Sequence, residues 1–398
     1  MSAARKVTEF NVDDFVGAAL EASASHFGKE HCYVAAEHQK TFTVVPIRPL
    51  CLQWMIESNG WPLGRLTQSG GPFGTHKSTF IFQLIRWYLE AGGMAVLIDT
   101  ENKTSDTLMR SMIPAEYFDP EDPRSKRFQV FRARTVNEWQ RMISMQKELI
   151  STKVEQLGRK PNFPIFWAVD SMRGATSAEG LEQIKSEGEA GGRGYSDIPI
   201  LISQFMSSMP DSLIGLPITM HMSHHEKPGM GQPGMVRAGG KAPDFYATLD
   251  IQFSRGGVTA MGKSREFDRA DMQAKNIEMS IRKSSMGSDV GKDIAVSFCW
   301  KFVDGQQISW WEWDAATAML LINHQREMKA AGIDINKVET QNTGTKVFSE
   351  ELGVKKDEAM TAKDFGALVE NTPEVRERII KALQVIRQNV VFDGVNVL

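Results

Sequence analysis

A glycine-rich segment between a short apolar run and an amphipathic run constrains the fold of this chain more than any other feature. Residues 71–78 read GPFGTHKS. They match the phosphate-loop pattern G-x-x-x-x-G-K-[ST] except at His76, which stands where the second glycine belongs. Backbone N–H groups and a helix N-terminus bind phosphate oxygens in such a loop. The segment therefore predicts a strand, a phosphate-binding loop and a helix in direct succession.

The chemistry of this loop assigns roles to its residues. Lys77 is expected to reach the β- and γ-phosphates of a nucleotide, and the Ser78 hydroxyl is expected to ligate Mg²⁺. A histidine at position 76 is tolerable only if its backbone keeps an allowed φ or accepts some strain. The predicted nucleotide-binding residues are Gly71, Pro72, Phe73, Gly74, Thr75, His76, Lys77, Ser78 and Thr79.

Two further apolar runs end in acidic residues. Residues 97–101 (LIDTE) place Glu101 at the carboxyl edge of a predicted strand, where a carboxylate can activate a water for attack on a γ-phosphate. Residues 166–171 (FWAVDS) follow the Walker B pattern, whose Asp170 would hold Mg²⁺ together with Ser78. The three elements in this order indicate nucleotide hydrolysis, with Lys77 and Glu101 as catalytic residues.

Short β-rich runs alternate with longer amphipathic runs from residue 65 to about residue 313, which is typical of βαβ units on a mainly parallel sheet. The chain is therefore expected to be an α/β protein with an ATPase core over 46–325. A small N-terminal helical oligomerisation element is predicted over 1–45, and a C-terminal helical region over 326–398. Strands are predicted at 94–99, 163–170, 217–223 and 248–253, an antiparallel extension at 277–281 and 294–300, and helices at 78–91, 135–157 and 198–213.

Composition limits the classes of protein to consider. Hydrophobic residues make up 41% and charged residues 24% of the chain, which excludes disorder as its main character. The net charge is -3, so no global basic field attracts nucleic acid or an anionic membrane, and cations that bind DNA must be gathered locally. No signal peptide and no run of about 18 uncharged apolar residues is visible, so we expect a cytoplasmic protein without a membrane span.

Two long stretches rich in Gly, Ser and Pro, residues 174–197 and 225–241, interrupt the predicted core. Both follow predicted strands directly, at the edge where an open α/β sheet binds its ligands. The second stretch is the more cationic, with only Glu226 opposing its charges, and is a credible contact for nucleic-acid phosphates. The basic residues are Lys185 and Arg193 in the first stretch and Lys227, Arg237 and Lys241 in the second.

The order of these motifs resembles the RecA recombinase family, and within it the phage UvsX-type recombinases. Beside the phosphate loop, the resemblance rests on residues 99–101 (DTE), 169–171 (VDS) and 239–247 (GGKAPDFYA), and it extends from about residue 46 to 313. A bulky residue before Lys77 and the pair 223–224 (SH) are similar to the UvsX-type members. The resemblance implies a RecA-type P-loop ATPase core with two DNA-binding loops.

The same resemblance implies roles for further residues. His224 would sense the γ-phosphate as part of the catalytic machinery and relay its state to the loop that follows. Arg282 and Lys283 would reach the nucleotide of a neighbouring subunit. Residues 174–197 and 225–241 correspond to the DNA-binding loops, so that Gly239 and Gly240 join the basic residues named above as expected DNA contacts.

The function that this resemblance implies is that of an ATP-dependent homologous recombinase. Such a protein forms a helical filament on single-stranded DNA, pairs it with duplex DNA and exchanges strands, using ATP and Mg²⁺ between subunits. A loader and a single-strand DNA-binding protein are further implied partners. Two alternatives stay open: a hexameric RecA-fold helicase or motor, and a filament scaffold that binds ATP without hydrolysis, which His76 favours.

Overall fold

The computed structural model divides the chain into two units, Met1–Phe42 and Thr43–Leu398. Most of the first unit, and with it most of the helical element predicted over 1–45, lies outside the described residues. The structure describes residues 18–19, 21–23, 25–26, 43–158, 161–178, 182, 198–213, 216–228, 235–237, 242–256, 258–259, 262–263, 272–286, 292–340 and 344–386.

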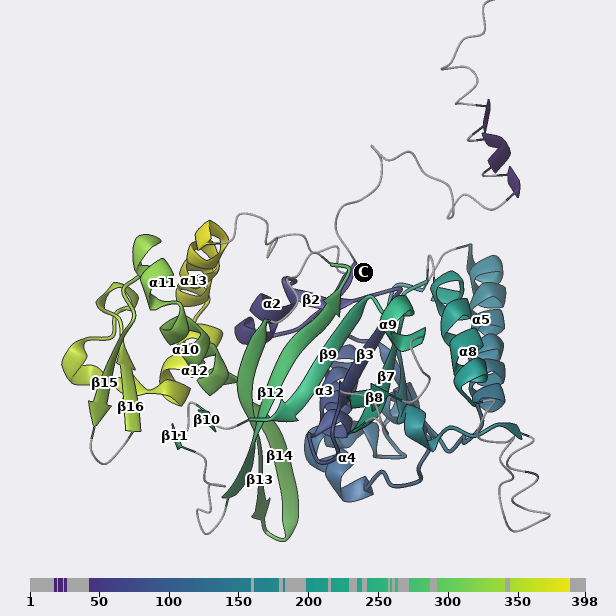
Figure 1. Cartoon of the computed structure of the whole chain (residues 1–398), viewed down its shortest axis with the longest axis horizontal. Helices are drawn as coiled ribbons and strands as arrows, with labels where there is room; N and C mark the ends of the chain where they lie inside the picture. Colours follow the sequence, from purple (N-terminus) through teal and green to yellow (C-terminus); the bar gives the residue numbers. More distant parts are fainter. Residues whose placement is uncertain are drawn as a thin grey trace, which may run out of the picture. The chain divides into compact units, whose positions relative to one another are not determined.

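A large, mostly parallel sheet forms the centre of the second unit (Figure 1). Its strands are β3 (Leu66–Gly71), β4 (Met94–Asp99), β5 (Phe128–Phe131), β6 (Ile165–Asp170), β7 (Ile218–Pro228), β8 (Met235–Arg237), β9 (Leu249–Arg255), β12 (Met272–Ser284), β13 (Asp293–Val303) and β14 (Gln306–Glu312). They are ordered β14-β13-β12-β9-β3-β7-β6-β4-β5, and β8 pairs with β7. The strands from β9 to β5 are parallel and β12 to β14 are antiparallel, which confirms the predicted α/β class with a mainly parallel sheet.

Helices cover both faces of the parallel part of the sheet. In β4 and β6, Leu97 and Phe166 pack into a hydrophobic cluster with α3, whereas Val96 and Trp167 pack into a second cluster with α5 and α8. A strand buried on both faces needs apolar residues at nearly every position, which explains the runs MAVLID and IFWAVD. These helices are α3 (Lys77–Glu90), α5 (Val136–Leu157) and α8 (Ile198–Leu213), with the shorter α4 (Asp106–Met112) and α9 (Ala242–Tyr246) beside the sheet.

The predicted elements of the core are confirmed, some of them to the residue. Strand β4 and helix α8 have the predicted bounds. Helix α5 begins where Thr135 and Glu138 form a reciprocal capping box, and it ends at Gly158, which adopts the left-handed conformation. Short local signals of this kind are encoded within a few residues, so the sequence is sufficient to place them.

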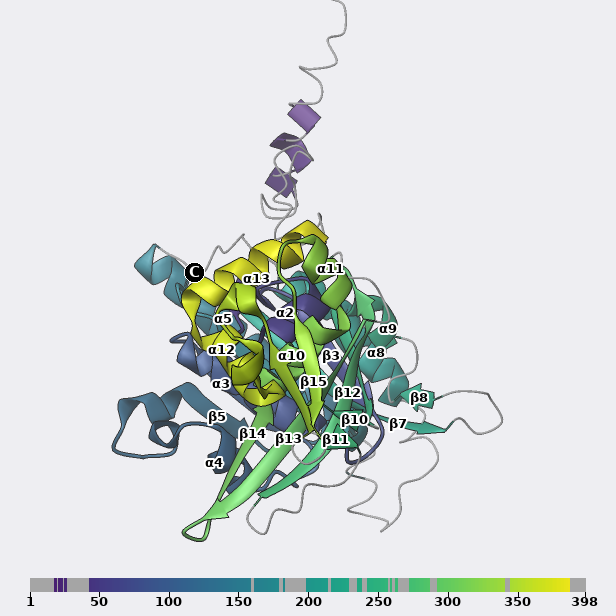
Figure 2. The same ribbon diagram turned by 90° about the vertical axis from the view of Figure 1, so that its left-hand side faces the viewer.

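The C-terminal part of the unit differs from its prediction as a purely helical region (Figure 2). It contains α10 (Trp313–Asn323), α11 (Gln325–Ala330), α12 (Ala362–Asn371) and α13 (Pro373–Ile386), but also an antiparallel sheet of β15 (Asn336–Thr340), β16 (Gly344–Phe348) and β17 (Met360–Thr361). The strands of this sheet are short and mostly polar, so they carry little of the apolar alternation that predicts a strand. The prediction was therefore incomplete here.

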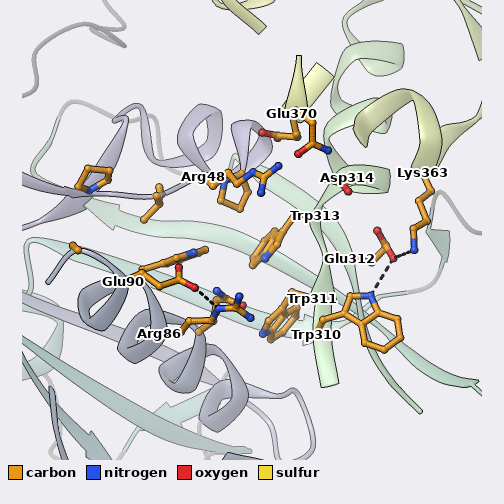
Figure 3. A pocket seen from close by; sticks show the side chains of 17 residues that line it. Arg48, Arg86, Glu90, Trp310, Trp311, Glu312, Trp313, Asp314, Lys363 and Glu370 are labelled. Atoms are coloured by element: carbon orange, nitrogen blue, oxygen red, sulfur yellow. Dashed lines mark hydrogen bonds and ion pairs between the residues drawn. The ribbon is translucent and has the colours of Figure 1, made fainter. Parts of the chain in front are cut away.

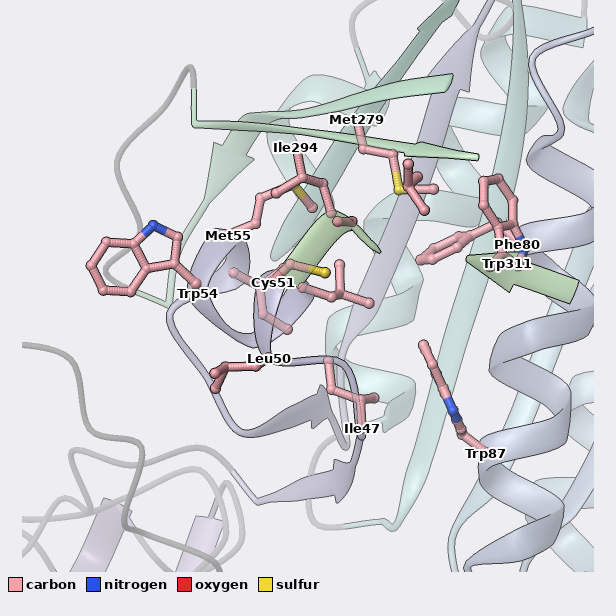
Figure 4. Packing of buried hydrophobic residues seen from close by; sticks show 14 of the residues in the cluster. Ile47, Leu50, Cys51, Trp54, Met55, Phe80, Trp87, Met279, Ile294 and Trp311 are labelled. Atoms are coloured by element: carbon pink, nitrogen blue, oxygen red, sulfur yellow. The ribbon is translucent and has the colours of Figure 1, made fainter. Parts of the chain in front are cut away.

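One hydrophobic cluster continues from the core across the predicted boundary at residue 325. Phe365 and Leu383 of the C-terminal helices belong to the same cluster as Leu321 and as Phe80 of the core. Every residue of α2 (Leu50–Ile56) is buried in it, and Cys51 and Met55 point toward the strands that carry Met279 and Ile294 (Figure 4). The C-terminal region is thus packed as part of the core unit.

None of the described helices is long and apolar enough to cross a bilayer.

The remaining described elements are short. They are strands β1 (Val44–Pro46), β2 (Gly60–Pro62), β10 (Val258–Thr259) and β11 (Gly262–Lys263) and the 3₁₀ turns η2 (Ala115–Tyr117), η3 (Pro123–Arg127), η4 (Met172–Gly174), η5 (Glu350–Leu352) and η6 (Lys356–Glu358).

Candidate nucleotide-binding site

The phosphate loop connects β3 to α3, as the sequence predicts. At the end of β3, Gly71 has a φ of 153° and lies so close to β9 that a Cβ atom there would stand 2.2 Å from the Phe253 carbonyl oxygen. Only glycine fits this position. The loop then turns over residues 72–75, and its last residues form the first turn of α3. Its backbone therefore reaches a helix N-terminus, where N–H groups are available to an anion.

Lys77 is held by the loop that precedes it. Its Nζ atom donates hydrogen bonds to the carbonyl oxygens of Gly71 (2.9 Å) and Pro72 (2.8 Å) and to Oγ1 of Thr75 (3.3 Å). The residue is only 4% exposed, and burial lowers the pKa of its ammonium group to about 8. Because a buried ammonium group gains from any added negative charge, the site favours a phosphate near Lys77.

His76 keeps the loop conformation in spite of its side chain. Its backbone is left-handed, with φ 59° and ψ 31°. Its ring packs against aromatic side chains of the antiparallel strands β13 and β14. The ring centroid is 4.4 Å from that of Phe298 and 6.4 Å from those of Trp300 and Trp311. Burial, and then the charges of Lys275 and Lys77, lower the pKa of His76 to about 4, so that the ring is neutral at neutral pH.

Replacement of His76 by glycine is expected to destabilise the protein by about 2 kcal/mol. Loss of a packed ring costs about 3 kcal/mol or more, whereas glycine relieves about 1 kcal/mol of left-handed strain. Urea unfolding measures the difference. Asp304→Gly is the control, because Asp304 is exposed and also has a positive φ of 51°, so that only the strain changes. An H76G variant more stable than the wild type would show that strain outweighs packing.

Asp170 lies at the end of β6 beside the phosphate loop. Its Oδ1 atom accepts a hydrogen bond from Ser223 Oγ (2.6 Å), and Ser78 also hydrogen-bonds to this carboxylate. Burial raises the pKa of Asp170, an effect that a cation would reverse. A hydroxyl and a carboxylate are oxygen ligands of the kind that Mg²⁺ prefers, and the ion commonly takes its remaining ligands from phosphates and water. Ser78 and Asp170 thus fit a Mg²⁺ bound together with a nucleotide.

Glu101 follows β4 and is oriented by its neighbours. Its carboxylate accepts hydrogen bonds from Ser171 Oγ and Lys103 Nζ, both at 2.7 Å. Burial alone would raise the pKa of Glu101, but these two donors outweigh burial and hold the pKa below its usual value. Asp99 fixes the turn by accepting the backbone N–H groups of Glu101 (3.2 Å) and Thr104 (3.1 Å). Glu101 is therefore ionised and able to accept a proton.

The structure places His225, rather than His224, beside these groups. Strand β7 pairs with β3 so that His224 lies opposite Gly70 and His225 opposite Gly71, and successive side chains point to opposite faces. Nε2 of His225 is 3.7 Å from Oε1 of Glu101, whereas His224 is fully buried. Burial lowers the pKa of His225 to about 4, so the ring is neutral at neutral pH. The β-strand alternation predicts that the two histidines face opposite sides of the sheet, but the register of β7 decides which of them faces Glu101.

One cavity of about 430 Å³ brings the predicted groups together. Lys77, Ser78, Glu101 and Asp170 line it, and they come from the start of α3 and the carboxyl ends of β4 and β6. His225 and Lys275 line it too, although neither was predicted from the sequence. This volume is within the range of small-molecule sites, about 300–1,000 Å³. The arrangement can hold a phosphate chain and place a carboxylate at its end.

Arg237, predicted to contact DNA, is buried in ion pairs within its own chain. Its side chain is 2% exposed, and its guanidinium group donates hydrogen bonds to Glu226 (2.7 Å), Asp250 and Gln252 (3.0 Å). The sequence prediction counted only the charges inside the loop, whereas Asp250 comes from β9. In this arrangement Arg237 is not available to a phosphate, so DNA contact requires these ion pairs to break.

The remaining predicted cations are engaged or lie outside the described residues. Arg282 forms ion pairs with Glu226 (3.2 Å) and Asp244 (3.3 Å), and Lys283 donates hydrogen bonds to two backbone carbonyl oxygens near the end of α9. Their contact with a neighbouring nucleotide stays a prediction. Lys227 lies in β7, but its side chain is outside the described part of the chain. Also outside are Lys185, Arg193, Gly239, Gly240 and Lys241.

A larger cavity of about 770 Å³ lies between α3, α10 and α12 (Figure 3). Trp310, Trp311 and Trp313 line it, with charged side chains around them. Several of these charges pair with one another, as Arg86 does with Glu90 at 2.7 Å. The cavity contains no residue of the phosphate loop, so the candidate active site is the smaller one.

Comparison with known proteins provides no further assignment for this site. No protein-family model matches the chain, and no curated protein is significantly similar to it. What the chain does must therefore be inferred from the geometry of the site and from its motifs.

Proposed function

We propose that the chain is an ATP-dependent homologous recombinase of the RecA type, which hydrolyses ATP at the phosphate loop. The observation that carries this proposal is the convergence of Lys77, Ser78, Asp170 and Glu101 on one cavity at the carboxyl edge of a parallel sheet. Each of these groups has the chemistry that one part of phosphoryl transfer needs. The motif in residues 239–247 favours a recombinase over other P-loop ATPases.

In the proposed reaction, the residues divide between binding and proton transfer. Backbone N–H groups at the start of α3 and the Lys77 ammonium group bind the phosphates and stabilise their charge. Ser78 and Asp170 hold Mg²⁺, which supplies further charge stabilisation when bound. Glu101, ionised and fixed by Ser171, orients a water and accepts its proton. His225 lies beside Glu101 as a neutral polar group and is positioned to contact the γ-phosphate or the water.

Filament formation on DNA is the second part of the proposal. Phe245 in the GGKAPDFYA segment is 71% exposed, so its ring is accessible to a neighbouring subunit. The loop 225–241 begins within β7, the same strand that carries His225. A change at the γ-phosphate would therefore act on the strand from which the DNA-binding loop emerges.

ATP hydrolysis with and without single-stranded DNA, across a salt series, tests the proposal. We expect DNA to stimulate turnover and the stimulation to fade with salt, because binding to DNA phosphates releases counterions. Electron microscopy of the DNA complex then distinguishes an open filament from a closed ring, which would favour a helicase or motor. Turnover that is indifferent to DNA would contradict the recombinase. Bound nucleotide without any turnover would identify the scaffold instead.

A further inference from the structure

A second cavity, of about 500 Å³, adjoins the nucleotide site on the side of Glu101. The two cavities share Phe73, Glu101, Lys103 and His225. Phe73 and His225 stack with their ring centroids 6.1 Å apart, so an aromatic pair stands between the two spaces. The second cavity therefore lies directly beside the Glu101 side of the candidate nucleotide cavity.

Arg134 and Arg173 line this second cavity and are positioned by backbone contacts. The Thr176 N–H donates to the carbonyl oxygen of Arg134 (2.9 Å), which ties the segment before α5 to the segment after Arg173. Gly174 allows the turn η4 to lie against the end of β4, because a Cβ atom there would stand 2.3 Å from Thr100 Oγ1. The two arginines thus reach the same cavity from separate elements through a close-packed backbone.

The charges of this cavity are unbalanced. Its charged residues are Lys103, Arg134 and Arg173 against Glu101, and Lys103 already pairs with Glu101 at 2.7 Å. Neither arginine side chain has a hydrogen bond or an ion pair with any residue that the structure describes. Both side chains are exposed, and two guanidinium groups that pair with no described carboxylate, beside the candidate nucleotide site, match the donor pattern that binds phosphate.

We propose that this second cavity binds a phosphate group through Arg134 and Arg173, next to the site of ATP hydrolysis. The proposal rests on the proposed function for its context. Two sources supply the same chemistry: the phosphate released from ATP, or a backbone phosphate of DNA held where the loop 174–197 begins. In either case, the oxygens of the phosphate accept hydrogen bonds from both guanidinium groups.

Calorimetric titration of inorganic phosphate into the full chain saturated with Mg-ADP tests the site. The double variant Arg134→Gln/Arg173→Gln is expected to bind phosphate about tenfold more weakly for each arginine lost. The matched control is Arg132→Gln/Arg141→Gln, which removes the same charge from positions that are likewise exposed but lie outside the cavity. Equal phosphate affinity in the wild type and the R134Q/R173Q variant, or no measurable binding to the wild type, overturns the proposal.

Binding of single-stranded DNA identifies the source of the phosphate. Loss of phosphate affinity with unchanged DNA binding assigns the site to released phosphate. Loss of both, with a shallower salt dependence of DNA binding, assigns it to a DNA phosphate. The proposed function is tested separately, because a chain that hydrolyses no ATP and binds no DNA, yet binds phosphate through these arginines, disproves the recombinase and keeps the site. DNA-stimulated turnover of the wild type, together with phosphate binding that is unaltered in R134Q/R173Q, supports the recombinase and disproves the phosphate site.

Discussion

Replacement of Lys77 by alanine is expected to lower ATP turnover at least about 10²–10³-fold, the loss typical of removing one group that stabilises transition-state charge. The variant loses the ammonium group nearest the phosphates and also leaves three loop oxygens, those of Gly71, Pro72 and Thr75, without their donor. Nucleotide binding should weaken together with turnover, since the loop itself loses its internal hydrogen bonds. Steady-state hydrolysis and a fluorescent nucleotide titration measure the two effects.

The pH dependence of the wild type provides an independent check on Lys77. Only the protonated amine attracts a phosphate, and the pKa of Lys77 without ligand is about 8. Nucleotide affinity should therefore fall as the pH rises above about 8, and the loss should be absent from K77A. Lys153→Ala is the control, because Lys153 is an exposed residue on α5 away from the cavity. A K77A variant with normal turnover would contradict the assignment of the phosphate loop.

Replacement of Glu101 by glutamine is expected to lower turnover about 10²–10⁴-fold, the usual contribution of a general base. Glutamine keeps the size of the side chain and can still accept a hydrogen bond from Ser171, but it cannot take a proton from water. Nucleotide binding should therefore persist, and a single-turnover experiment should locate the loss in the chemical step. DNA binding with ATP should also persist or become longer-lived, because hydrolysis no longer ends it.

Glu90→Gln is the matched control for this experiment. Glu90 ends α3, is exposed and pairs with Arg86, so its replacement changes the net charge equally but lies outside the nucleotide cavity. Unchanged turnover in E101Q would remove Glu101 from the proposed reaction. Loss of nucleotide binding in E101Q would instead show that the carboxylate maintains the structure of the site.

Most elements of the core could be predicted from the sequence because their signals are local. The runs MAVLID and IFWAVD are apolar up to their last residue since helices cover both faces of the sheet; the first ends in Asp99, two residues before Glu101, and the second ends in Asp170. The capping box at Thr135 likewise encodes the start of α5 within four residues. The sheet of β15, β16 and β17 escaped prediction, because short polar strands owe their structure to pairing with distant partners.

The candidate site was predictable in part, and the exceptions share one cause. The phosphate loop, Asp170 and Glu101 are recognisable because each stands in a motif of fixed spacing. Arg237 was interpreted from the charges near it in the chain, but its ion-pair partners include Asp250, which is 13 residues away in β9. His225 reaches Glu101 only because β7 and β4 belong to one sheet. Contacts between separate strands depend on the fold and cannot be predicted from the spacing of residues along the sequence.

The sequence by itself determined the α/β class, the order of the main strands and helices, and the residues proposed for phosphate chemistry, because hydrophobic period and motif spacing are properties of short segments. Only the tertiary structure decided which histidine faces the cavity, that Arg237 is buried in ion pairs, and that Arg134 and Arg173 line a cavity together. It also showed how His76 is accommodated, by packing its ring against Phe298 of a distant strand. These features depend on strand register and packing, which the whole fold sets at once.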